Sequence, residues 1–154
     1  KSIVLPPNIF NIALSFLANT KISKILIPKS VGLCDVATFK NCVNLTSIVF
    51  EDGGDVPLYV GGDLWLENTQ VTILVLPFKT YRIRGYWRRG SNLNTLYVKS
   101  TIPPILEHGW GDNPDTCDLY VPIGCKEVYA SATNWGSFRT ITEYDFDLNP
   151  NNVH

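Results

Sequence analysis

Hydrophobic residues recur along this chain in short clusters, and each cluster begins with an aromatic residue. In the segment 39–50, for example, Phe39 is followed by Leu45, Ile48 and Phe50. The leading aromatic residues are Phe16, Phe39, Trp65, Trp87 and Trp110, which are separated by 23, 26, 22 and 23 residues. A period of this length predicts a solenoid in which each coil contributes one strand and one turn.

The clusters contain apolar residues at alternate positions, a pattern that sends their side chains to one face of a strand. The inward-facing pairs are Ile3/Leu5, Ile25/Ile27, Ile48/Phe50, Leu74/Leu76, Leu96/Val98 and Leu119/Val121. Stacked coils would place these strands side by side in a parallel sheet, about 4.8 Å apart. The aromatic residues would form a second internal column on the opposite wall, where neighbouring coils bury each other's apolar faces.

The pattern changes after Pro122. Apolar residues from Cys125 to Trp135 follow one another at helical spacing, and the stretch 138–146 has the pattern of an extended segment. We therefore predict solenoid coils over 1–122, a helix-containing C-terminal cap over 123–146 that closes the sheet edge, and a frayed tail over 147–154. Because Ile3 and Leu5 match a coil without its first half, the chain is expected to be a fragment or a processed form of a longer protein.

Composition narrows the class of protein. The chain has 154 residues, of which 45% are hydrophobic and 18% are charged, as in an ordered domain with a core. A net charge of −1 gives no general attraction to nucleic acid or to an anionic membrane. No apolar run approaches the ~20 residues needed to cross a bilayer, so we expect no membrane insertion.

The four cysteines, Cys34, Cys42, Cys117 and Cys125, do not form a C-x-x-C metal or redox pattern. We expect buried free thiols, and a disulfide between Cys117 and Cys125 stays open as the alternative. No cofactor or metal site is predicted. The acidic loops 51–55 and 109–115 do not have the spacing of an EF-hand, although such loops can bind calcium. His108 lacks the motifs of a hydrolase site, so we predict that the protein is not an enzyme.

Segments 22–31 (ISKILIPKSV) and 37–48 (ATFKNCVNLTSI) resemble the BspA-like leucine-rich repeats, and the stretch 119–144 is similar to the closing segment of that family. The resemblance implies an α/β solenoid, a right-handed leucine-rich-repeat superhelix with a parallel sheet. It also implies a bacterial cell-surface or secreted protein that adheres to host proteins, other bacteria or matrix. No catalytic residues are characteristic of the family.

The outward face of the predicted sheet is the main candidate binding surface. The residues between the inward pairs would form a continuous apolar column, whereas an exposed sheet face usually carries polar residues. Its partner-binding members are Leu26, Val49, Val75, Tyr97 and Tyr120, with Val4 at the N-terminal end. The alternatives are ordinary strand propensity and burial against other parts of a parent protein.

A second candidate is a basic and aromatic patch, which could bind a glycan or another polyanion. It comprises Tyr81, Arg82, Arg84, Tyr86 and Arg88. A structural explanation of the charges is a surface ladder in which Arg89 lies between Glu67 and Asp112 of the neighbouring coils. We predict a non-catalytic module that binds a protein partner on its sheet face, with a structural spacer or a glycan-binding accessory domain as alternatives and no nucleic-acid partner.

Overall fold

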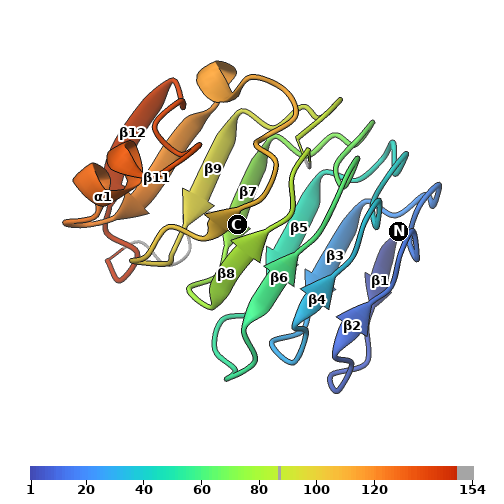
Figure 1. Cartoon of the computed structure of the whole chain (residues 1–154). Helices are drawn as coiled ribbons and strands as arrows, with labels where there is room; N and C mark the ends of the chain where they lie inside the picture. The colour runs from blue at the N-terminus through green and yellow to red at the C-terminus, as the bar shows by residue number, and fades with distance from the viewer. Residues whose placement is uncertain (87, 149–154) are drawn as a thin grey trace.

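The computed structural model describes residues 1–86 and 88–148, and these form a parallel β-solenoid of about six turns (Figure 1). One side of the solenoid, here called the long wall, consists of a three-stranded sheet and a four-stranded sheet in line. Its strands are β1 (Ser2–Val4), β3 (Lys24–Ile27), β5 (Ser47–Phe50), β7 (Ile73–Leu76), β9 (Thr95–Val98), β11 (Asp118–Pro122) and β12 (Thr140–Tyr144).

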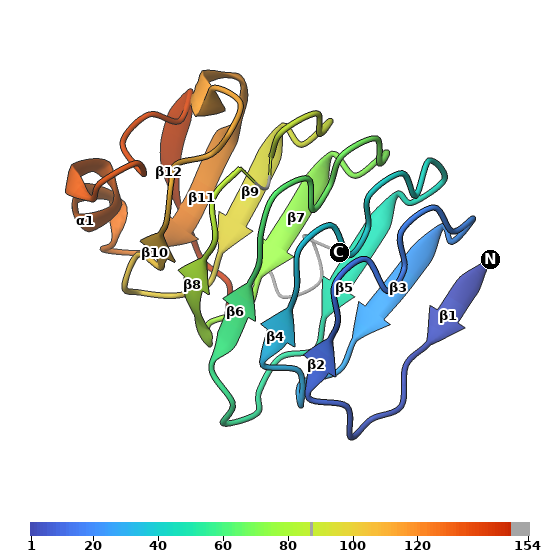
Figure 2. The same ribbon diagram turned by 45° about the vertical axis from the view of Figure 1, so that its right-hand side comes forward.

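The opposite side is a five-stranded parallel sheet of shorter strands, here called the short wall (Figure 2). Its strands are β2 (Asn11–Ile12), β4 (Leu33–Cys34), β6 (Leu58–Val60), β8 (Thr80–Ile83) and β10 (Ile105–Leu106). Each of these coils therefore has two strands, and the prediction of one strand per coil is wrong. Strands of two to four residues are too short to produce a detectable alternation of apolar and polar residues.

The predicted pairing of the long-wall strands is confirmed. Ile25 lies between Ile3 and Ile48 in the ladder, and Leu96 lies between Leu74 and Leu119. These aliphatic residues, together with the aromatic and aliphatic residues of the turns, form one continuous hydrophobic core. The coils bury each other's apolar side chains, as a solenoid requires.

The predicted aromatic column is only partly correct. Phe39 and Trp110 are buried in it, but Phe16 is 63% exposed and the neighbouring Leu17 takes the buried position. The register is set by turn residues with positive φ, namely Asn19, Asn41, Asn68 and Gly90, at 61°, 59°, 56° and 65°. Counting back two residues from each gives Leu17, Phe39, Leu66 and Arg88. Trp65 is also buried and packs edge-on against Phe39 at 5.0 Å. Trp87 lies outside the described residues.

Helix is scarce in the described residues, so the expectation of an α/β solenoid is wrong and the coils are built from strands and turns. The helices there are a 3₁₀ turn, η1 (Pro114–Thr116), and α1 (Lys126–Ser131). Helical spacing extended to Trp135, but α1 ends at Ser131. Trp135 is nevertheless buried, and its Nε1 donates to the carbonyl of Pro104 at 2.9 Å.

The C-terminal strand does not close the sheet as expected. β12 pairs in parallel with β11, with Leu119 opposite Ile141, and becomes the last strand of the long wall. Helix α1 lies between these two strands in sequence and packs beside them (Figure 1). The predicted cap segment 123–146 thus extends the sheet by one strand and adds a short helix at its side.

All four cysteines are free and buried. Burial raises the pKa of the Cys34 thiol to about 12 and that of Cys117 to about 11. The expectation of buried free thiols is confirmed, and the alternative disulfide between Cys117 and Cys125 does not form.

The predicted charge ladder through Arg89 does not form. Glu67 pairs instead with Lys40, with 3.0 Å between Nζ and Oε2, and Asp112 accepts the backbone N–H of Gly90 at 2.7 Å. The side chain of Arg89 is exposed. An amide ladder connects the coils on this side, because the side chain of Asn41 donates to Asn19 and accepts from Asn68 at 3.0 and 2.8 Å.

Candidate interaction surface

The outward face of the long wall has the geometry that the sequence predicts. Leu26 lies beside Val4 and Val49 in the ladder, and Tyr97 lies beside Val75 and Tyr120. The exposure of these side chains changes along the column. Val4 is 90% exposed and Leu26 45%, whereas Val75 is only 8% exposed and is not available to a partner.

The N-terminal half of this face is an open apolar groove. It is a shallow concavity of about 260 Å³ between the first strands, and its floor is formed by the outward side chains Val4, Leu26 and Val49. Lys24 and Ser47 border it at the start of β3 and β5. Nothing in the described part of the chain covers Val4, so a hydrophobic strip faces solvent here.

The C-terminal half of the same face is covered by the chain itself. Tyr97 and Tyr120 stack on each other, with 4.5 Å between ring centres. Tyr144 packs edge-on against both rings at 5.2 and 6.0 Å, and Phe146 reaches back to Tyr97 at 6.3 Å. This burial, followed by the nearby Tyr120 and Tyr144 hydroxyls, raises the pKa of Tyr97. The two tyrosines predicted as contact residues are therefore half-buried under the segment after β12.

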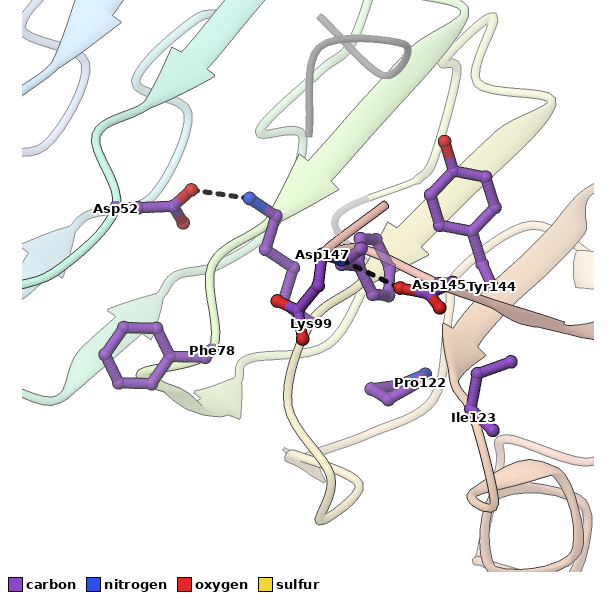
Figure 3. Close-up of a pocket in the computed structure, with 9 residues that line it drawn as sticks. Asp52, Phe78, Lys99, Pro122, Ile123, Tyr144, Asp145 and Asp147 are labelled. Carbon is purple, nitrogen blue, oxygen red and sulfur yellow. Dashed lines mark hydrogen bonds and ion pairs between the residues drawn. The ribbon is translucent and has the colours of Figure 1, made fainter. Parts of the chain in front are cut away.

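A pocket of about 660 Å³ opens next to this covered region (Figure 3). Phe78 stands on one side of it and Tyr144 and Ile123 stand on the other. The ammonium group of Lys99 extends toward Asp52 and pairs with its carboxylate at 2.5 Å. The remaining lining residues are Pro122, Asp145, Phe146 and Asp147.

The sequence analysis did not identify this pocket. Its residues follow directly after strands that are distant in sequence, and only the stacking of the coils brings them together. A usable signal was the alternation of Tyr144 and Phe146, two aromatic residues that continue the outward phase of β12 beyond its end.

The predicted basic and aromatic patch lies on the outer side of the short wall. A register shift between β6 and β8 aligns Leu58 with Thr80 and Tyr59 with Arg82. Tyr81 is thus an additional residue in β8 and is exposed, in the manner of a β-bulge. The guanidinium of Arg82 pairs with Glu107 and lies 5.7 Å from the ring of Tyr59.

Two further members of this patch, Arg84 and Tyr86, are exposed. Tyr86 stacks on His108, with 6.3 Å between ring centres. The structure thus brings Tyr81, Arg82, Arg84 and Tyr86 to exposed or partly exposed positions of the β8 region.

Arg88 does not belong to the patch. Its side chain is only 3% exposed, and its guanidinium donates to the carbonyls of Leu93 at 2.8 Å and Asn113 at 3.1 Å. Arg88 occupies the column position of Leu17, Phe39 and Leu66, where it holds two turns together from the inside. It was assigned to the surface because adjacent arginines suggest a solvated charge run, whereas the turn register places it in the core.

In the described part of the chain, no group of three or more His, Cys, Asp or Glu side chains is arranged to hold a metal ion. The helices described there are too short to cross a membrane. A scan against models of known protein families gives no match, and no curated protein matches the sequence at a significant level.

Proposed function

We propose that this chain is a non-catalytic binding module that recognises an extended polypeptide on the outward face of its long wall. The observation that supports the proposal is the open apolar groove over Val4, Leu26 and Val49. An exposed sheet face of a monomeric protein is usually polar, and a continuous apolar strip is typical of an interaction surface. The groove is also preformed, so a partner would lose little binding energy to rearrangement of the module.

In this proposal the module is a leucine-rich-repeat-type coil array of the BspA-like kind, from a cell-surface or secreted bacterial protein that functions in adhesion. The sequence resemblance in segments 22–31 and 37–48 supports this assignment. The parallel stacking of coils with a period near that of such repeats is consistent with it.

The test is a selection of displayed random peptides on the immobilised full chain, followed by binding measurements on variants. The proposal expects enriched peptides whose affinity falls at least tenfold for Leu26→Lys, because a charge on the groove floor would have to be desolvated. The matched control is Ile102→Lys, at another exposed aliphatic residue (76% exposed) away from the groove. Peptides that bind equally to Leu26→Lys would refute the proposal.

Two alternatives give different results in the same series. A structural spacer predicts self-association that Leu26→Lys abolishes, which sedimentation velocity would detect. A glycan-binding domain predicts binding on a glycan array that Tyr81→Ser abolishes and Leu26→Lys leaves unchanged.

A further inference from the structure

The pocket beside Tyr144 is positioned to contribute to the same recognition surface. It runs along the carboxyl ends of the long-wall strands, and Asp52, Phe78 and Lys99 follow directly after β5, β7 and β9. Asp52 comes three residues after Val49, which lines the apolar groove. Three extended residues span about 10 Å, so one extended segment of a partner can reach both the groove and the pocket.

The pocket carries an excess of negative charge. Carboxylates of Asp52, Asp145 and Asp147 line it, and Lys99 is its basic residue. Asp145 Oδ1 accepts the backbone N–H groups of Asp147 and Leu148, both at 3.0 Å. The carboxylate of Asp147 is exposed and has no ion pair with any other described residue.

The pocket already holds one cation between a carboxylate and an aromatic ring. Lys99 Nζ lies 2.5 Å from Asp52 Oδ2 and 6.0 Å from the ring centre of Phe146. Phe78 offers a second ring, 54% exposed, on the other side of the pocket (Figure 3). A planar guanidinium stacks on such a ring and binds a carboxylate at the same time.

We propose that this pocket receives an arginine side chain of the partner polypeptide, with the guanidinium between Phe78 and the carboxylate of Asp147. This inference rests on the proposed function, and it adds the partner's chemistry: a basic residue close to a short apolar segment. The pocket would then supply charge selectivity, while the groove supplies apolar contact area.

The experiment uses the isotope-labelled full chain and two probes, blocked arginine (Nα-acetyl-arginine methylamide) and the corresponding citrulline compound, which has the same shape without the charge. We expect saturable amide shifts at Phe78, Lys99 and Asp147 with arginine, and binding of citrulline that is at least fivefold weaker. Asp147→Asn should raise the Kd for arginine about two- to fivefold, as for one exposed ion pair.

Asp63→Asn is the matched control, because Asp63 is an exposed acid in the turn after β6. It should leave the Kd for arginine unchanged. Phe78→Ser tests the stacking contact independently of charge and should also weaken arginine binding. Equal binding of citrulline and arginine, shifts that avoid the pocket, or saturable shifts with N-acetylglucosamine alone would overturn the inference.

A third probe separates this inference from the proposed function. An apolar peptide without basic residues, acetyl-Val-Thr-Val-Thr-Val-amide, should shift the amides of Leu26 and Val49 if the groove binds polypeptides. If it does so while blocked arginine fails, the arginine pocket is refuted and the groove proposal stands. If arginine binds at the pocket and the apolar peptide does not bind, the groove proposal fails.

Discussion

The segment after β12 should stabilise the fold only moderately, because it packs on an outer face and not in the core. The double substitution Tyr144→Ser and Phe146→Ser removes three ring contacts with Tyr97 and Tyr120 and the contact of Lys99 with the Phe146 ring. Half-buried aromatic pairs contribute about 0.5 kcal/mol each, and partial burial of two rings adds a similar amount. We expect the free energy of unfolding to fall by about 2 kcal/mol.

Urea unfolding followed by circular dichroism measures this change. With a slope of about 2 kcal/mol/M for a chain of this size, the midpoint should fall by about 1 M at an unchanged slope. In the same variant the pKa of Tyr97 should decrease toward the ordinary tyrosine value, because its burial and the Tyr144 hydroxyl are lost. Phe10→Ser, at an exposed phenylalanine, is the control and should cost less than about 0.5 kcal/mol.

Two results would refute this reasoning. A loss above about 4 kcal/mol is the cost of removing a core aromatic residue, and it would show that the segment belongs to the core. An unchanged midpoint with an unchanged pKa of Tyr97 would show that the segment does not pack on this face in solution.

Three further predictions follow from buried and paired groups. Arg88→Met should lower the free energy of unfolding by about 3 kcal/mol, measured by urea unfolding, because the carbonyls that Arg88 binds lose charged donors; Arg89→Met should change it by less than about 0.5 kcal/mol. The buried thiols, with raised pKa values at Cys34 and Cys117, should resist a thiol reagent until the chain unfolds. Hydrogen bonds from Arg139 and Thr140 lower the pKa of Asp118 to about 2, so this carboxylate stabilises the fold above its unfolded pKa near 4 and the contribution, up to about 1 kcal/mol, is lost as the pH falls toward 2; Arg139→Gln should flatten that part of the stability profile.

The strand register of the long wall could be predicted because alternate apolar residues at a constant spacing leave one consistent alignment. Leu74, Leu96 and Leu119 differ by 22 and 23 residues, and the ladder follows those steps. The buried turn column could not be predicted in the same way. Positions 16 and 17, like 65 and 66, are both apolar, and the choice between them depends on the positive φ at Asn19 and Asn68.

The covering of Tyr97 and Tyr120 could not be predicted from the strand pattern, which says where a side chain points and not what lies over it. The contact of Phe146 with Tyr97 crosses from beyond β12 to β9, and no local spacing encodes such a return of the chain. Lys99 and Asp52 pair across two coils for the same reason. The candidate site was therefore identified by its direction and misjudged in its accessibility.

The segment 144–147 changes both parts of the candidate surface, and this determines how substitutions should be interpreted. It covers Tyr97, so it limits the open apolar area to the N-terminal half of the face, and it supplies Asp145 and Asp147 to the pocket. A change at Tyr144 or Phe146 would alter apolar contact and charge selectivity together. A change at Leu26 or Asp147 alters only one of them, because these residues lie at opposite ends of the surface. Comparison of these single variants is therefore what separates recognition by the groove from recognition by the pocket.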